Sequence, residues 1–272
     1  MAIIGNWLSV RRKRSDQLEQ GLYAASGLSW SATFGFELVR RGSVSDYVPD
    51  RFHHDRNRSK YDKIGCAVSD RSFAAFLAGN ANNAIDPMRF YFLAMVCDLV
   101  EKEAIAGDVA ELGVYKGNTA FLLAELARRT GRTAYLFDTF KSLPERDFIG
   151  IDSNIRDRKS DFIDTSIEAV RALVGSANVE IIAGYFPDSI TKAAAATRYA
   201  LVHLDCDLYI PTRAGLEFFY PRLVSGGFLI VHDYMSLYWD GIEKAINEFF
   251  VDKPERFIPI PDKSGTIALR KQ

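Results

Sequence analysis

The chain has 272 residues, of which 48% are apolar and 25% charged, and its formal net charge is −1. This composition excludes a mainly disordered chain and argues against a dedicated nucleic-acid binder. The length suits one large domain, or one domain with a lid. The three cysteines have no CxxC spacing, which argues against a disulfide scaffold or a cysteine zinc site and favours a reducing, cytoplasmic compartment.

Residues 1–86 show no pattern that identifies a domain, and we expect a helical N-terminal extension there. Its first apolar residues precede the basic ones, the reverse of a secretory signal, and the chain has no apolar stretch long enough for a transmembrane helix. The polar, basic segment 40–63 predicts a substrate lid, with a solvated surface loop as the alternative. The extension carries more apolar bulk than a tail needs, which predicts a homo-oligomer contact, most simply in a two-fold dimer: Trp7, Leu8, Leu22, Trp30, Phe34 and Phe36.

From Pro87 onward, helical and strand patterns alternate. Apolar residues at helical spacing predict a helix from Pro87 to about residue 104. Apolar strands are expected over 108–114, 133–140, 179–185, 199–209 and 228–234, with helices between them and two short strands near 256–260 and 265–270. Strands separated by helices require a parallel sheet covered on both faces, so residues 87–272 are predicted to form one doubly wound α/β domain. Ligands of such sheets bind at the carboxyl ends of the strands.

The turn after the first of these strands, Glu111 to Gly117, predicts a cofactor site. Gly113 permits a tight turn and Gly117 lets the next helix start close to the sheet, but Tyr115 replaces the glycine that admits a pyrophosphate. Glu111 would repel a diphosphate and suits a cationic ligand, and Asp138 ends the next strand, where a carboxylate typically accepts hydrogen bonds from ribose hydroxyls. A ligand with a ribose and a positive charge favours S-adenosylmethionine over NAD. The alternative is a turn that binds nothing, with Glu111 solvated.

Two further strands end in carboxylates. Asp205 ends the fourth strand and Asp233 the fifth, so their ends would lie about 4.8 Å apart if the strands are neighbours. Carboxylates that close repel each other unless a cation or proton lies between them, which predicts a divalent metal site. Asp207 would then be available as a general base.

These segments together resemble the macrocin O-methyltransferases, class I enzymes that methylate sugars in antibiotic biosynthesis and include the mycinamicin and novobiocin enzymes. The resemblance covers about residues 87–250 and rests on AELGVYKG, YLFDTF, DFIDTSIEAV, AGYFPDSI, LVHLDCDLYIPT and GGFLIVHDY. It implies a mostly parallel seven-stranded, Rossmann-like sheet and S-adenosylmethionine as cofactor. It places Glu111, Gly113, Tyr115 and Gly117 at the methionine end of the cofactor, Asp138 at the ribose, Ser142 in the nearby loop, and Gly184, Tyr185 and Phe186 at the adenine.

The resemblance also implies a magnesium site at Asp205, His232 and Asp233, with Asp207 as the base. The family has an aspartate where this chain has His232. Magnesium prefers oxygen ligands whereas manganese tolerates a mixed shell, so either ion is possible at this site. His232 is alternatively a bystander, or itself the group that takes the substrate proton, and His203 is expected to orient Asp205 at most.

The expected activity is therefore metal-dependent O-methylation of a hydroxyl on a sugar or secondary metabolite. A phenol or catechol methyltransferase and a catalytically silent binding protein of the same fold are the alternatives, and an NAD-dependent dehydrogenase is a more distant one. The expected partners are a small-molecule or saccharide acceptor and a second copy of the chain, without nucleic acid.

Overall fold

The computed structural model describes residues 28–31, 37–40, 43–44 and 69–272. The chain divides into two compact units, residues 1–60 and 61–272, so the boundary falls earlier in the chain than the expected residue 86. Most of the expected lid segment 40–63 and five of the six large apolar residues named in the extension lie outside the described residues.

The described part of the first unit is a small antiparallel sheet. It contains β1 (Leu28–Ser31), β2 (Glu37–Arg40) and β3 (Ser43–Val44), in the order β1-β2-β3. A helical extension was expected here, and for these residues that expectation is wrong. Trp30 pairs with Leu38 across the β1–β2 ladder, so backbone pairing between strands determines the local structure.

The second unit begins its described part with a helix, α3 (Asp70–Leu77), capped by the Ser69 side chain. A short 3-10 helix, η2 (Ala81–Ile85), leads to α4 (Pro87–Lys102). The Asp86 side chain caps α4, and Pro87 is its first residue, a position at which proline is common. Asn118 joins α3 to the segment between β4 and α5, because its side-chain amide donates to the carbonyls of Ala75 and Ala78 at 2.9 and 2.8 Å. Residues 70–86 therefore pack as part of the second unit.

The centre of this unit is a seven-stranded sheet with the order β6-β5-β4-β7-β8-β10-β9. Five strands are parallel, and β10 and β9 are antiparallel additions at one edge. This confirms the predicted doubly wound fold. The strands are β4 (Asp108–Leu112), β5 (Ala134–Asp138), β6 (Val179–Ala183), β7 (Tyr199–Leu204), β8 (Leu223–Val231), β9 (Ile258–Pro259) and β10 (Ile267–Arg270).

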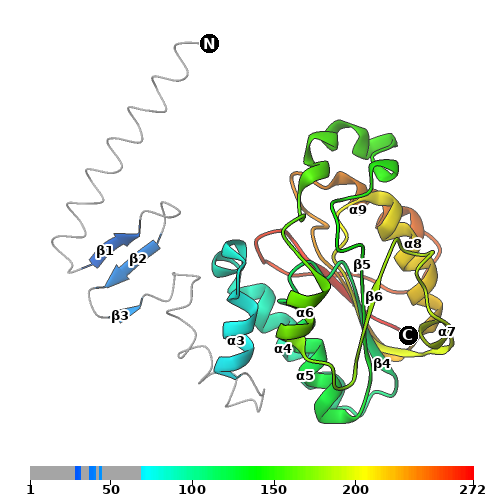
Figure 1. Ribbon diagram of the computed structural model, residues 1–272, viewed down its shortest axis with the longest axis horizontal. Coiled ribbons are helices and arrows are strands. Elements are labelled where there is room, and N and C mark those ends of the chain that lie inside the picture. Colours follow the sequence, from blue (N-terminus) through cyan, green and yellow to red (C-terminus); the bar gives the residue numbers. More distant parts are fainter. Residues whose placement is uncertain (1–27, 32–36, 41–42, 45–68) are drawn as a thin grey trace. The chain divides into compact units, whose positions relative to one another are not determined.

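Helices cover both faces of the sheet (Figure 1). On one face α4, α5 (Ala120–Thr130) and α6 (Ile167–Val174) pack on Val109, Leu136 and Leu201. On the other, α7 (Lys192–Ala196), α8 (Tyr209–Phe219) and α9 (Asp240–Phe249) pack on the alternate strand positions, such as Ala110 and Phe137. The two-residue period of a strand thus divides the core into two layers. None of the helices in the described residues has the length and apolar character needed to cross a bilayer.

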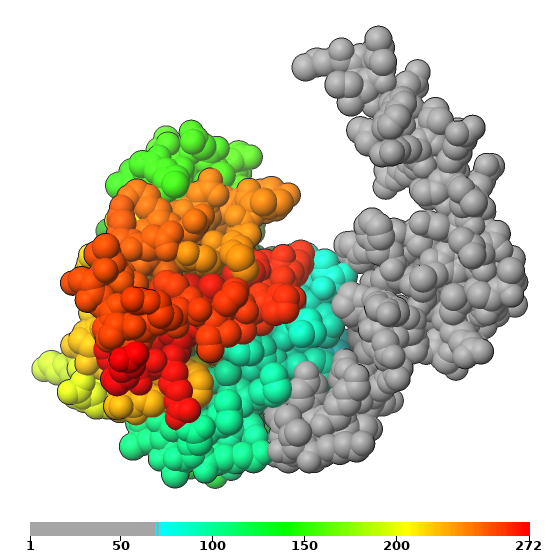
Figure 2. Space-filling view, turned by 180° about the vertical axis from the view of Figure 1, so that it is seen from behind, coloured from blue at the N-terminus to red at the C-terminus, as the bar shows by residue number. Residues whose placement is uncertain are grey.

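Two boundaries differ from the sequence prediction in ways that matter for the site. β7 ends at Leu204 and α8 begins at Tyr209, so Asp205 and Asp207 lie in a turn and not in a strand. The expected polar loop 141–160 contains the 3-10 helices η3 (Glu145–Asp147) and η4 (Gly150–Ser160), and α6 begins at Ile167 instead of residue 161. Figure 2 shows the η4 region, in green, as a lobe at one end of this unit beside the orange segment that leads into α9.

Candidate active site

A cavity of about 590 Å³ opens at the carboxyl ends of β4, β5, β7 and β8. β5 lies on one side of β4 and β7 on the other, so β4 and β7 meet where the strand order reverses. Loops after two such strands diverge to opposite faces of the sheet and leave a crevice between them. The volume is within the range of small-molecule sites.

The loop after β4 approaches β7 closely. A Cβ atom on Gly113 would lie 1.8 Å from the Asp205 carbonyl oxygen, and Gly113 has a φ of 91°, so only glycine fits there. Gly117, at a φ of 81°, lets α5 begin against Val170 of α6. Tyr115 lines the cavity, and its hydroxyl donates to Asp164.

Asp138, at the end of β5, holds this loop. Its Oδ2 atom accepts hydrogen bonds from the amides of Val114 and Tyr115, both at 2.8 Å, and Oδ1 accepts one from Phe140 at 2.6 Å. Burial raises the pKa of the carboxyl group although these three bonds oppose that shift. Asp138 lines the cavity, so the same side chain faces both the loop and any ligand.

Three of the expected cofactor residues do not line the cavity: Glu111, Gly117 and Ser142. Glu111 is fully buried, not solvated, and its Oε1 atom contacts Thr119 Oγ1 at 2.5 Å and His203 Nδ1 at 2.7 Å. His203 therefore pairs through Nδ1 with Glu111 in the sheet. Thr119 does line the cavity, so Glu111 supports the cavity wall through it.

The far end of the cavity combines Gly184 and Tyr185 with a buried carboxylate that the sequence did not single out. Tyr185 donates from its hydroxyl to Asp147 Oδ1 at 2.7 Å, and its ring lies under the Arg146 guanidinium, 3.1 Å from the ring centroid. Asp147 is 1% exposed and lines the cavity, and its Oδ2 atom has no hydrogen-bond partner among the described residues. A buried acceptor of this kind is expected to bind a donor from a ligand or a water molecule.

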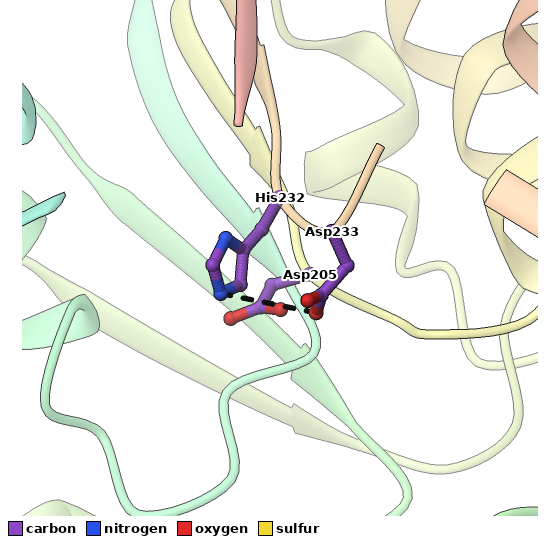
Figure 3. A group of neighbouring side chains, drawn as sticks. All are labelled: Asp205, His232 and Asp233. Atoms are coloured by element: carbon purple, nitrogen blue, oxygen red, sulfur yellow. Dashed lines mark ion pairs between the residues drawn. The ribbon is translucent and has the colours of Figure 1, made fainter. Parts of the chain in front are cut away.

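At the other end, Asp205, His232 and Asp233 converge (Figure 3). β7 and β8 are neighbours and pair Leu204 with Val231, so the next residues of both strands emerge side by side. One ligand atom from each of the three side chains lies within 4.8 Å of the others, and His232 Nε2 is 3.8 Å from Asp233 Oδ2. Two carboxylates and an imidazole at this spacing are a donor set that fits a divalent cation.

A largely buried arginine also reaches this cluster. Arg89, from the first turn of α4, forms an ion pair with Asp205 Oδ2. Although burial opposes ionisation, Arg89 followed by His232 and His203 lowers the pKa of Asp205. Burial and the Asp205 charge raise the pKa of Asp233 to about 7.

The pKa of His232 moves the other way. Burial and then the Arg89 charge lower it well below its ordinary value, which favours the neutral imidazole. The neutral ring is the form that can coordinate a metal ion.

Asp207 lies beside the cluster and lines the cavity. It reaches this position through the turn after β7, with a φ of 65°, and not through strand alternation. Burial, then Asp233 and Asp205, raise the pKa of Asp207 well above its ordinary value. A carboxylate with a raised pKa binds a proton more strongly and is a better acceptor for a hydroxyl proton.

Arg158 and several exposed apolar residues line the rim of the cavity. Arg158 of η4 lies over the rings of Tyr238 and Trp239, 4.5 and 5.2 Å from their centroids, so η4 and the segment before α9 contact each other at this rim. Met235, Leu237 and Tyr238 line the mouth with 50%, 90% and 58% of their surfaces exposed. Apolar side chains this exposed at a cavity rim mark a surface for an apolar ligand.

The sequence reading did not identify Arg89, Asp147 or Arg158 as cavity residues. A signal existed only for Arg89, a charged residue between Met88 and Phe90 in a helix that is otherwise apolar at its start. Asp147 and Arg158 come from the polar segment 141–160, in which no periodicity distinguishes one charged residue from another.

The fold resembles solved methyltransferase structures. The structure of the O-methyltransferase NovP aligns with a TM-score of 0.62 at 23% identity, over 71% of this chain and 83% of that one. CalS11, a calicheamicin methyltransferase, aligns with a TM-score of 0.53 at 20% identity, over 89% and 99%. The fold is thus the class I, Rossmann-like methyltransferase fold.

The sequence comparisons agree. The family described as Macrocin-O-methyltransferase (TylF) matches residues 51–258. A Streptomyces olivaceus enzyme, 8-demethyl-8-(2,3-dimethoxy-alpha-L-rhamnosyl)-tetracenomycin-C 4'-O-methyltransferase, is 30% identical over 62% of this chain and 67% of its own length. Demethyldecarbamoylnovobiocin O-methyltransferase of Streptomyces niveus is 29% identical over 57% and 63%, and mycinamicin III 3''-O-methyltransferase of Micromonospora griseorubida is 27% identical over 49% and 57%. The chain thus spans between about half and two thirds of each of these relatives.

The chain belongs to the macrocin O-methyltransferase family and is an O-methyltransferase.

Proposed function

We propose that the chain transfers the methyl group of S-adenosylmethionine to a sugar hydroxyl of a glycosylated secondary metabolite, with the help of a divalent cation. One observation carries this proposal: the ligand atoms of Asp205, His232 and Asp233 gather within 4.8 Å in the same cavity that holds Asp138 and the loop after β4. The name of one relative, the Streptomyces olivaceus enzyme, supports a glycosylated acceptor because it refers to a rhamnosyl compound.

The cofactor would lie along the loop after β4, with its ribose at Asp138 and its methionine end near Gly113 and Tyr115. Its adenine would reach Gly184 and Tyr185, where the unpartnered Asp147 Oδ2 atom offers an acceptor for an amino group. Glu111, Gly117 and Ser142 would act from behind the cavity wall. The family membership supports S-adenosylmethionine over a phosphate-bearing cofactor such as NAD.

The cation would be held by Asp205, His232 and Asp233. When bound, a divalent ion polarises a hydroxyl oxygen and lowers its pKa. Because one ligand is an imidazole, we expect manganese to bind better than magnesium at this site.

Asp207 is the base in this proposal. It accepts the proton of the acceptor hydroxyl while the hydroxyl oxygen forms a bond to the methyl carbon and the carbon–sulfur bond breaks. The sulfonium charge is lost in the same step, because the electron pair of that bond stays on sulfur in S-adenosylhomocysteine. His232 is the less favoured base, because burial lowers its pKa.

The acceptor is expected to pair a polar sugar with an apolar aglycone. The sugar diol would face the carboxylates, and the aglycone would contact the apolar rim formed by Met235, Leu237 and Tyr238. Arg158, held over two aromatic rings, would stay at the mouth of the cavity.

The test is a methyl-transfer assay with radiolabelled S-adenosylmethionine and a panel of glycosides and phenols. We expect methylation of a glycoside that a chelator abolishes and that manganese restores better than magnesium. His232→Asp should move the preference toward magnesium, because it restores an all-oxygen shell. Glu243→Gln, an exposed position on α9, is the control and should keep the wild-type preference. Transfer that persists after chelation, or that uses only phenols, would contradict the proposal.

A further inference from the structure

A line of three side chains leads away from the Asp205–Asp233 cluster on the side of β10. His232 Nδ1 lies 2.9 Å from Thr266 Oγ1, and that hydroxyl contacts Asp262 Oδ2. Asp262 Oδ1 also accepts a hydrogen bond from the Thr266 amide at 2.8 Å, so the carboxylate is fixed to this residue by two bonds. Thr266 and His232 are 2% and 5% exposed.

The chemistry of these groups decides where each hydrogen lies. An ionised carboxylate has no hydrogen to donate, so the Thr266 hydroxyl must donate to Asp262. The same hydroxyl then presents a lone pair to His232, and Nδ1 must supply the hydrogen of that contact. In a neutral imidazole only one nitrogen carries a hydrogen, so Nε2 is left with its lone pair.

That lone pair faces the cluster. His232 Nε2 lies 3.8 Å from Asp233 Oδ2, on the side of the ring that points toward Asp205 and Asp233 (Figure 3). Two carboxylates at this position would favour a hydrogen on Nε2, because it could then donate to either of them. The Thr266 contact opposes that preference from the other side of the ring.

We propose that the Asp262–Thr266 pair fixes His232 in the tautomer with hydrogen on Nδ1, and so keeps Nε2 ready to bind a cation together with Asp205 and Asp233. Thr266 and Asp262 are positioning residues, since they act through His232. The tautomer follows from the described contacts alone, while its use in cation binding rests on the proposed function. An imidazole ligand usually needs such an outer partner to hold its ring and its hydrogen in place.

Nitrogen-15 NMR of the metal-free, full-length protein with labelled histidine tests the tautomer directly. The chain has four histidines, and His232→Gln identifies the signal. We expect wild type and Thr266→Ser, which keeps the hydroxyl, to show hydrogen on Nδ1 and a bare Nε2. Thr266→Val removes the acceptor with little change in shape, and its His232 signal should shift to the Nε2–H form. A wild-type spectrum with hydrogen on Nε2, or on both nitrogens, overturns the proposal, and so does a folded Thr266→Val protein with the wild-type spectrum.

Manganese binding measured by electron paramagnetic resonance, without cofactor or acceptor, tests the consequence. Thr266→Val should bind Mn²⁺ about 10-fold more weakly and lose the nitrogen coupling of the bound ion, whereas Thr266→Ser should behave as wild type. Equal affinity and equal nitrogen coupling in all three proteins would overturn the positioning role. If the wild-type tautomer is as expected but no variant binds Mn²⁺, the cation in the proposed function is wrong while the tautomer assignment stands.

Discussion

Single residues of the same type have different surroundings in the cavity, as its carboxylates show. Asp138 accepts three backbone hydrogen bonds, whereas burial and the nearby carboxylates of Asp233 and Asp205 raise the pKa of Asp207. In the sequence the two residues look alike, since each is an aspartate at or just after a strand end. In the structure Asp138 organises a loop, whereas the surroundings of Asp207 favour binding of a proton.

Asp138→Ala removes both the acceptor for a ribose and the anchor of the loop after β4. We expect S-adenosylhomocysteine to bind more weakly by about 1–3 kcal/mol, the usual range for hydrogen bonds to a charged group. Titration calorimetry measures this. Asp252→Ala, an exposed carboxylate outside the cavity lining, should leave the affinity unchanged. An unchanged affinity in folded Asp138→Ala would contradict the assignment.

Asp207→Asn should lower turnover without weakening ligand binding. The amide keeps the size of the side chain but cannot take a proton, so kcat should fall by about 10²- to 10⁴-fold. Binding of S-adenosylhomocysteine and Mn²⁺ should stay as in wild type, because Asp207 is not one of the three clustered ligands. A variant that loses Mn²⁺ binding would instead make Asp207 a ligand, and full activity would exclude it as the base.

At the scale of elements, α4 brings two charged residues to the site from outside the sheet. Asp86 caps the helix, and Arg89, three residues later in its first turn, pairs with Asp205. Periodicity predicted the helix because its apolar residues repeat at helical spacing. Periodicity could not predict the contact between Arg89 and Asp205. A helical repeat indicates the face of the helix on which a residue lies, but not which distant loop packs against that face.

Asp86 should give a measurable pH dependence. Burial and then Asp262 raise its pKa to about 6, although Arg89 and the Lys263 amide favour its ionised form. A raised folded-state pKa means that the carboxyl group destabilises the fold increasingly as pH rises from about 4 to about 6. Asp86→Asn keeps the helix cap without the charge. The difference in unfolding free energy, variant minus wild type, should rise by about 2 kcal/mol between pH 4 and pH 7.

Urea titrations at several pH values measure this difference. Asp240→Asn, an exposed residue in the first turn of α9, is the matched control and should show no comparable trend. A flat difference for Asp86→Asn would mean that the carboxyl group titrates near its unfolded value.

Arg89→Met should make the fold depend on a cation. Removing one partner of a buried ion pair typically costs about 3–5 kcal/mol, since the remaining carboxylates are left uncompensated. A divalent ion would replace the missing positive charge, so Mn²⁺ should raise the Tm of the variant more than that of wild type. Arg213→Met, at a half-buried position on α8 outside the cavity lining, controls for loss of an arginine that pairs with a carboxylate. If Mn²⁺ raises the Tm of Arg89→Met by no more than that of wild type, Arg89 does not share the cation site.

At the scale of the whole molecule, the sequence predicted the parallel sheet and the meeting of Asp205 with Asp233, because alternating strands and helices leave few topologies. It could not predict η3 and η4, whose polar residues lack a repeat and are ordered by contacts such as that of Arg158 with Tyr238 and Trp239. It also missed the strands β1 to β3, which are too short for periodicity to identify.

The division into two units leads to the last prediction. Among the residues that the structure describes, those that line the cavity lie in the second unit, from Asn80 onward, and so do those of both core layers. A chain that begins at Tyr61 should therefore fold and bind S-adenosylhomocysteine with the affinity of the full-length protein. If the apolar residues of the first unit form the expected dimer contact, light scattering should give a dimer for the full chain and a monomer for the shortened one. A shortened protein that folds but no longer binds the ligand would show that the first unit completes the site. A shortened protein that remains a dimer would place the contact on the second unit.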